Sequence, residues 1–172
     1  MITPDYARVM AAYNAEMNRR IYAAADTLDD AARRADHGAF FGSLHGTLSH
    51  LLWGDAIWMA RFDGWEKPDI GISGSPSWEP DWTQLKARRI EQDARISEWA
   101  ARVSHDWLAA PHTWFSAAAG RELTRPTWLL VTHVFNHQAH HRGQAHALCT
   151  RLGAKVADTD LPFILPMDAL PA

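Results

Sequence analysis

The sequence predicts an all-α fold: an up-down four-helix bundle with two irregular connections and an extended C-terminal tail, built as one domain over residues 1–172. Three observations support this prediction. Four segments carry apolar residues at the three- and four-residue spacing of an amphipathic helix. Residues that start helices precede these segments, and glycine- and proline-rich stretches separate them. A chain of 172 residues has the length of one domain and can bury a core without disulfides.

The first helix is expected from Thr3 and Pro4 to about Leu28. A threonine at the N-cap and a proline at the first helical position are both typical of a helix start. The segment that follows is rich in alanine and contains no glycine or further proline, and its apolar residues keep helical spacing. Residues 29–41, which include Gly38, are expected to connect it to the next helix.

The second helix is expected to begin after Ser43 as its N-cap and to end near Phe62. Its apolar stripe consists of Leu44, Leu48, Leu51, Leu52, Trp58 and Met59. Residues 63–80 should form a loop, because three glycines and three prolines interrupt both regular elements. The stretch GISGSP within this segment is interpreted as flexible.

Asp81 is a suitable N-cap for a third helix, expected from about Trp82 to Val103. One face of this helix is charged, and the other carries Leu85, Ile96 and Trp99. The second irregular connection follows over residues 104–125. Within it, residues 113–115 are expected to be a short extended piece.

Pro126 starts the fourth helix, which is expected over residues 127–152 and should end at Gly153. The tail beyond it cannot be helical throughout, and its apolar content predicts that it packs back on the body. The tail residues that carry this prediction are Leu161, Pro162, Phe163 and Pro166.

Composition argues against several classes of protein. Hydrophobic residues make up 47% and charged residues 22% of the chain, and the formal net charge is −3. No block of lysine and arginine favours a nucleic-acid partner, and no apolar run approaches the roughly 20 residues of a membrane span. Cys149 is the single cysteine, so an intrachain disulfide is impossible, which suits a reducing compartment. The N-terminus lacks the apolar core of a signal peptide, and a cytoplasmic protein is therefore expected.

The candidate chemistry lies in the histidines. The chain has ten, and six of them gather in two short stretches of the predicted helices. These six are His45 and His50 on the second helix and His133, His137, His140 and His141 on the fourth.

A helix turns by about 100° per residue, which predicts the face that each side chain shares. On the fourth helix, His137 falls in the middle of the apolar stripe, with His141 about 40° to one side and His133 about 40° to the other. His137 and His141 are therefore expected to face the core. Gln138 and Arg142 are expected to point well off the stripe.

Two buried imidazoles at positions i and i+4 can converge on one ion, as His137 and His141 would. Metal binding requires neutral imidazole, which also removes the cost of burying a charge. A third ligand has to come from elsewhere. His45 and His50 lie about 140° apart on the second helix, so both cannot easily face one site. Spacing alone leaves the choice open between them, with His133 as a further alternative.

The kind of site is limited by what the sequence lacks. There is no HExxH, no Glu-x-x-His and no CxxC pattern, so zincin, di-iron carboxylate and zinc-thiolate sites are not expected. An all-nitrogen site with three protein ligands leaves an open position, which is the form of catalytic zinc sites. We expect one divalent metal ion, foremost zinc or nickel, with iron, manganese or copper as alternatives.

At these residues the sequence resembles a known family. The stretches that carry the resemblance are FFGSLHGTLSHLLWGDAIWMARF, RPTWLLVTHVFNHQAHHRGQAHAL and DTDLPFIL. Together with the helix spacing they cover nearly the whole chain, and the NHxxHHRGQ pattern is the specific part. The sequence closely resembles the DinB family of small bacterial metal-binding bundles, in the DinB/YfiT-like superfamily. This family is unrelated to the error-prone DNA polymerase of similar name.

The resemblance implies a four-helix bundle, usually dimeric, with one metal ion on three histidines. In the family pattern the first ligand is the histidine of an LxHLL segment, which is His50 here. The other two ligands match His137 and His141. Some relatives in the superfamily are S-transferases that use mycothiol, bacillithiol or glutathione. The family name implies a stress-linked or damage-inducible role.

Residues near the histidines are candidates for supporting roles. Gln144 lies about 20° from the centre of the stripe, and Asp55 follows His50 by one and a half turns. Either side chain is a candidate to hold a ligand imidazole by a hydrogen bond. Arg142 is a candidate to steer an anionic substrate, with a surface or dimer salt bridge as the alternative.

Three functions remain in competition. The first is a metal-dependent transferase that activates a low-molecular-weight thiol or another small-molecule substrate. The second is metal-dependent hydrolysis by an activated water, for which the sequence offers no inward-facing glutamate as a base. The third is a non-catalytic metal-binding homodimer in a stress response.

Overall fold

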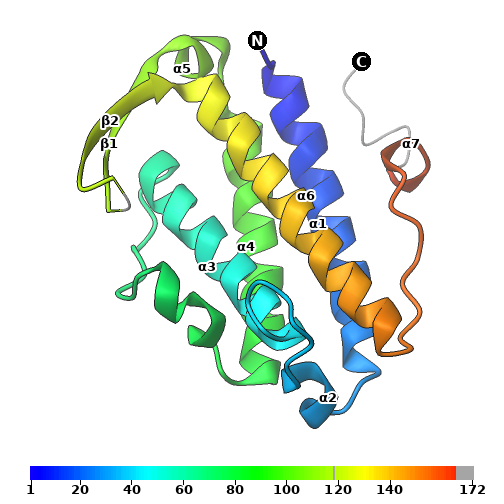
Figure 1. Cartoon of the computed structure of the whole chain (residues 1–172). Coiled ribbons are helices and arrows are strands. Elements are labelled where there is room, and N and C mark those ends of the chain that lie inside the picture. Colours follow the sequence, from blue (N-terminus) through cyan, green and yellow to red (C-terminus); the bar gives the residue numbers. More distant parts are fainter. Residues whose placement is uncertain (118, 166–172) are drawn as a thin grey trace.

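The computed structural model describes residues 1–117 and 119–165 and is mostly helical (Figure 1). Its four long helices are α1 (Pro4–Asp26), α3 (Leu44–Phe62), α4 (Trp82–Arg102) and α6 (Thr127–Arg151). The shorter helices are α2 (Asp30–Arg34), η1 (Ile72–Ser77), α5 (His105–Ala109) and α7 (Leu161–Ile164). Strands β1 (Pro111–Ser116) and β2 (Arg121–Pro126) form a small antiparallel sheet, so the all-α prediction was incomplete.

The long helices begin where the capping residues predict. The side chains of Thr3, Ser43 and Asp81 each accept a hydrogen bond from the backbone N–H three residues later. These bonds satisfy amides that the first turn of a helix leaves unpaired. At the other end of the fourth helix, Gly153 has φ of +83°, the left-handed conformation that ends many helices.

The four long helices lie side by side, with α1 and α3 each packed against both α4 and α6 (Figure 1). Two separate hydrophobic clusters fill the space between them. One joins the C-terminal part of α1 and the start of α3, around Leu44 and Leu48. The other joins the N-terminal part of α1 and the end of α3, around Met59 and Phe135.

In the predicted up-down bundle, successive long helices run in opposite directions. This prediction is wrong for α3 and α4, which run in the same direction (Figure 1). Phe62, at the end of α3, stacks on Trp99 near the end of α4, with ring centroids 5.8 Å apart. At the same end, Arg102 donates to Asp63 across 2.7 Å. The connection over residues 63–81 returns the chain along α3, and η1 packs on that helix. A helix of 19 residues is about 28 Å long, a span that a connection of this length can cross.

The hairpin formed by β1 and β2 replaces most of the second irregular connection. Its register pairs Trp114 with Leu123, and Gly120 turns the chain with φ of +65°. The extended piece predicted over residues 113–115 is thus part of a longer paired strand. Trp114 packs 6.0 Å from Trp58, which places the hairpin against α3.

The described part of the tail lies beside α1 (Figure 1). Tyr13 donates to the carbonyl of Thr159 across 2.6 Å, and Arg20 donates to the carbonyl of Asp158 across 3.1 Å. Ala154 and Val156 pack on the hydrophobic cluster around Leu44 and Leu48, whereas Phe163 is 87% exposed. Pro166 lies outside the described residues. No described helix is long and apolar enough to cross a membrane.

A buried polar layer separates the two hydrophobic clusters. Asp55 accepts hydrogen bonds from Arg89 across 2.7 Å and from Gln138 across 2.9 Å. Arg89 also pairs with Asp93 across 2.8 Å. The layer therefore ties α3, α4 and α6 together at mid-height by charged and amide groups, all of them buried.

Helix α1 completes this layer through two asparagines. Asn14 and Asn18 both donate to Asp93, and Arg142 donates to the Asn14 side chain. Gln138 and Arg142 are 0% and 5% exposed, so the prediction that they point off the buried face was wrong. The spacing of apolar residues located the buried face of α6 poorly, because the buried side chains of α6 are polar at the level of this layer.

Candidate metal centre

His50, His137 and His141 come together at the seam between α3 and α6. Each offers a ring nitrogen, and the three nitrogens all lie within 4.8 Å of one another. The Nε2 atoms of His50 and His137 are 3.2 Å apart. An ion with metal–nitrogen bonds of about 2.0–2.1 Å in tetrahedral geometry holds its nitrogens about 3.3–3.4 Å apart. One metal ion between these rings therefore fits the observed spacing.

The helices position the rings through simple geometry. His137 and His141 are one turn apart on α6, and their ring centroids lie 4.4 Å apart. His50 projects from the antiparallel helix α3, with its centroid 5.2 Å from that of His137 and 4.7 Å from that of His141. His137 is only partly buried, so the centre lies at the edge of the buried face rather than in its middle.

The tautomer of His50 follows from its contact with Ser75. The Ser75 hydroxyl donates its one proton to the carbonyl of Ile72 across 2.6 Å. The same oxygen lies 2.8 Å from Nδ1 of His50, so it accepts the proton that Nδ1 carries. Nε2 of His50 is then unprotonated, and its lone pair faces the other two histidines.

Gln144 sets the tautomer of His141 in the same way. Its amide oxygen lies 2.8 Å from Nδ1 of His141 and accepts the proton there. Its amide nitrogen lies 3.2 Å from Nε2 of His140 and donates to it. The hydrogen bond that was expected between Gln144 and a candidate ligand imidazole is thus present in the structure. Nε2 of His141 is left free to bind a metal ion.

Gly54 makes room for the third ring. A Cβ atom at this position would lie 2.9 Å from Cε1 and 3.5 Å from Nδ1 of His137. Such a close approach is tighter than real carbon contacts allow, so only glycine lets the ring come this close to α3. Sequence reasoning did not identify this residue.

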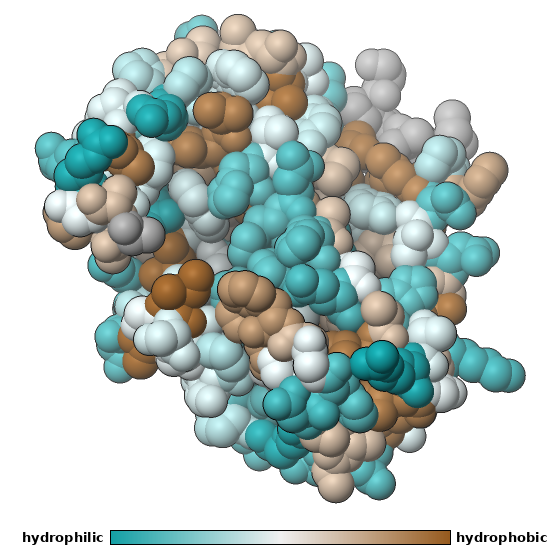
Figure 2. Space-filling model, in the orientation of Figure 1, coloured by the Kyte–Doolittle hydropathy of each residue, from teal (hydrophilic) through white to brown (hydrophobic). Residues whose placement is uncertain are grey.

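Aromatic rings surround His50. Phe41 stacks on it with a centroid distance of 3.8 Å and also lies 5.3 Å from His141. Trp53 stacks 5.7 Å from His50, and its indole nitrogen donates to the carbonyl of Ile70 across 3.0 Å. These rings lower the local polarity around the nitrogens. Figure 2 shows hydrophilic residues over the outer side of α6 on this face, with hydrophobic groups on either side.

This environment keeps the three imidazoles neutral. Burial, together with smaller contributions from the nearby His141 and His137, lowers the pKa of His50 to about 3. Burial and the neighbouring His141 likewise lower the pKa of His137 to about 4. The pKa of His141 is also lowered, mainly by burial. Neutral rings are the form that binds metal.

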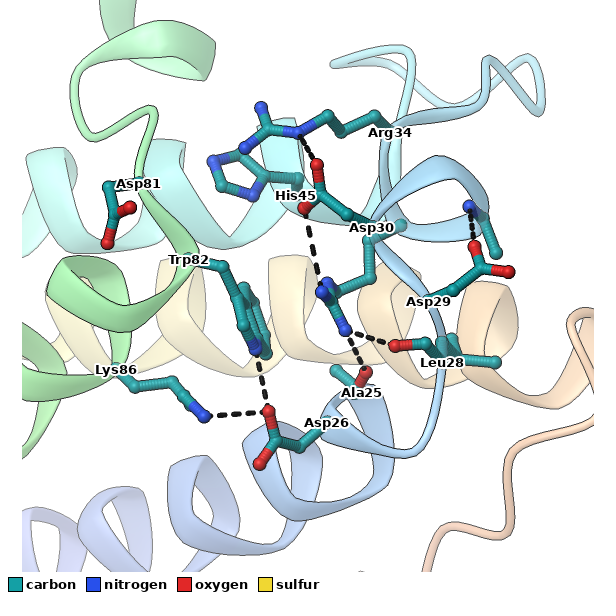
Figure 3. A network of polar contacts seen from close by, with 12 residues as sticks. Ala25, Asp26, Leu28, Asp29, Asp30, Arg34, His45, Asp81, Trp82 and Lys86 are labelled. Atoms are coloured by element: carbon teal, nitrogen blue, oxygen red, sulfur yellow. Dashed lines mark hydrogen bonds and ion pairs between the residues drawn. The ribbon is translucent and has the colours of Figure 1, made fainter.

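His45, the alternative to His50, lies at the end of the bundle near Trp82 (Figure 3). Its Nε2 atom meets the carbonyl of Glu79 at 2.8 Å. His45 therefore does not join the three histidines. Near it, Asp26 accepts hydrogen bonds from Trp82 and Lys86, each across 2.7 Å (Figure 3).

Two other predicted candidates also lie elsewhere. His133 packs 5.1 Å from Trp58 and 5.9 Å from His137, measured between ring centroids, and stands outside the cluster. The hydrogen bonds of Asp55 go to Arg89 and Gln138 instead of to an imidazole, because its carboxylate points into the buried layer.

Arg142 faces the core, where it donates to Asn14. It is buried, so neither the expected role in steering a substrate nor a surface salt bridge fits its position.

Ser75 contacts the cluster although the sequence analysis did not single it out. The stretch around it was interpreted as flexible, but it forms η1, and Ser75 is fully buried. A serine between Gly74 and Pro76 carried no signal that it would meet a histidine 25 residues earlier.

Of three comparisons with known proteins, one found a match. A search of curated proteins and a search of solved structures returned no match. The family model described as DinB family matches residues 1–168, which is nearly the whole chain. Because this model covers nearly the whole chain, the chain belongs to the DinB family.

Proposed function

We propose that the chain binds one divalent metal ion on the Nε2 atoms of His50, His137 and His141 and uses it as a thiol-dependent S-transferase. The observation that carries the metal proposal is the orientation of the rings. Ser75 and Gln144 accept the Nδ1 protons of two of them, which leaves unprotonated nitrogens facing one point. Without an ion, converging lone pairs in a partly buried site would repel one another.

Zinc and nickel are the ions we expect first, since both bind neutral imidazole well, and iron, manganese and copper are alternatives. Three protein ligands leave at least one coordination position for a substrate. A bound divalent ion supplies a Lewis acid that lowers the pKa of a coordinated thiol.

In the proposed reaction the thiol loses its proton to solvent water. Its sulfur then forms a bond to an electrophilic carbon of the second substrate, and the bond from that carbon to the leaving group breaks with its electron pair. His50, His137 and His141 position the ion for this chemistry. Phe41 and Trp53 shield one side of the centre from water.

Hydrolysis is the weaker candidate because it requires a base beside an attacking water. The cluster in the described part of the chain consists of imidazoles. Asp55, the nearby carboxylate on α3, is engaged by Arg89 and Gln138.

Metal binding is tested by titrating the metal-free protein with zinc and nickel and by elemental analysis. Wild-type protein should bind one equivalent, and His137→Ala should lose most of the affinity. His146→Ala is the matched control, because His146 lies on the same helix but lines a small cavity with Tyr13 and Met17. Equal affinity in wild type and His137→Ala would disprove the site.

The reaction is tested with monochlorobimane and chlorodinitrobenzene, each with glutathione, mycothiol and bacillithiol. A metal-dependent rate that His137→Ala abolishes supports the S-transferase. Absence of such a rate with every thiol refutes it, and a rate on ester or amide substrates would establish the hydrolase instead. The homodimer implied by the family resemblance belongs to the same proposal, and light scattering on the purified protein measures it.

A further inference from the structure

Arg61 lies on the same face of α3 as His50. The two residues are eleven positions apart, which puts their side chains within about 20° of each other and about 16 Å apart along the helix. Gly54 and Trp58 lie between them near the same face. Arg61 is about 10 Å along the helix from Gly54, the residue that His137 contacts.

Two tryptophans hold the Arg61 guanidinium. Its central carbon lies 4.4 Å from the ring centroid of Trp58 and 5.9 Å from that of Trp114 on the hairpin. Stacking on rings covers the faces of a guanidinium but leaves its N–H edge available to a planar acceptor. The side chain is therefore oriented before any ligand arrives.

The charge of Arg61 is not neutralised within the described residues. Neither a hydrogen bond nor an ion pair links it to a described partner, whereas Arg102 pairs with Asp63 at the same end of the bundle. Burial alone lowers the pKa of Arg61, and no carboxylate opposes that effect. Burial, and after it the positive charge of Arg61, lowers the pKa of His112 and of His133.

His133 connects this cation to the metal centre in space. Its ring lies 5.1 Å from Trp58 and 5.9 Å from His137. A small molecule lying along the seam between α3 and α6 would thus contact the rings of Trp58 and His133. It would reach Arg61 at one end and the three histidines at the other. A half-buried cation without an anion costs free energy, which an anionic ligand would recover.

We propose that Arg61 is a specificity-determining residue that binds the carboxylate of an anionic thiol whose sulfur reaches the three-histidine centre. This inference rests on the function proposed above. The substrate class is a small thiol with a carboxylate about 8–10 Å from its sulfur, which matches the spacing along α3 between Arg61 and Gly54, the residue beside His137. A carboxylate suits the site because it accepts two parallel hydrogen bonds from a guanidinium.

The test uses protein loaded with cobalt(II), whose absorption reports coordination of a thiol. The probes are 6-mercaptohexanoate, with about 8 Å between sulfur and carboxyl carbon when extended, and the uncharged 6-mercaptohexan-1-ol. Wild-type protein should bind the acid about tenfold more tightly than the alcohol. Arg61→Gln should lose this preference while its affinity for the alcohol stays the same.

Two further variants separate recognition from structure. Arg61→Lys keeps the charge and should retain part of the preference, whereas Arg102→Gln removes a nearby exposed arginine and should leave it intact. Added salt should reduce the preference in wild type, an effect that a purely structural role would not produce. Equal binding of both probes by wild type, or a preference that survives in Arg61→Gln, overturns the inference alone. Failure of the protein to bind cobalt overturns the proposed function as well.

Discussion

Replacing Gly54 with alanine should impair metal binding without harming the fold. The added Cβ would lie 2.9 Å from Cε1 of His137. Carbon atoms in contact rest about 3.5–4.0 Å apart, so the ring has to move by about 0.6–1.1 Å. Metal–ligand distances tolerate only about 0.2 Å of change. The displaced His137 would therefore lose its bond to the ion or strain it.

The size of the effect can be bounded. Substitutions that merely disturb the support of a metal ligand reduce affinity by about 10- to 100-fold. Gly54→Ala moves the ligand itself, so its loss should be at least in this range. In the metal-free protein the clash is relieved by rotating one partly exposed side chain. Alanine also favours a helix over glycine by about 0.5–1 kcal/mol, so metal-free stability should be unchanged or higher.

The assay is a competition titration of zinc against a chromophoric chelator, combined with thermal unfolding of the metal-free protein. Gly143→Ala on α6 is the matched control, because a Cβ there meets nothing within 4 Å. It should gain helix stability and bind zinc like wild type. Zinc affinity in Gly54→Ala equal to that of wild type would refute the proposed position of His137 at the ion.

Three further predictions follow from the same contacts. Ser75→Ala removes the acceptor for the Nδ1 proton of His50 and should lower zinc affinity by about 10- to 100-fold in the chelator assay, whereas an unchanged affinity would show that the tautomer is set otherwise. The metal-free protein should lose stability as the pH falls below about 6.5, because the folded-state pKa values of about 3 for His50 and about 4 for His137 lie below that of the unfolded chain. Urea unfolding from pH 7 to pH 5 measures this loss; His137→Asn should show a shallower dependence, and a flat wild-type profile would contradict the burial argument. Asp55→Ala leaves Arg89 and Gln138 without their shared acceptor and should cost about 3 kcal/mol or more in the same unfolding assay, while a loss below about 1 kcal/mol would mean that the layer rearranges.

Local signals in the sequence predicted the long helices well. Thr3, Ser43 and Asp81 cap them through bonds to amides three residues on, an interaction that needs no distant partner. The direction of α4 could not be predicted in this way. It depends on the connection after Phe62, which packs along α3 and returns the chain to the other end of the bundle.

The buried polar layer explains why the helical stripe was misjudged. Apolar spacing located the core side of α6 from its leucines and placed Gln138 and Arg142 outside. Both are buried, because Asp55 and Asn14 on neighbouring helices satisfy them. A polar side chain belongs in a core only when its partners exist, and those partners lie far away in sequence.

The sequence by itself determined that His137 and His141 face one point, because a spacing of four residues on a helix aligns side chains in any tertiary context. Family resemblance pointed to His50, but only the tertiary structure brought its Nε2 atom to 3.2 Å from that of His137. The same packing placed Ser75 and Gly54, whose contributions are a hydrogen bond and an absent side chain. Such features are defined by the approach of separate elements, so no pattern along one element predicts them.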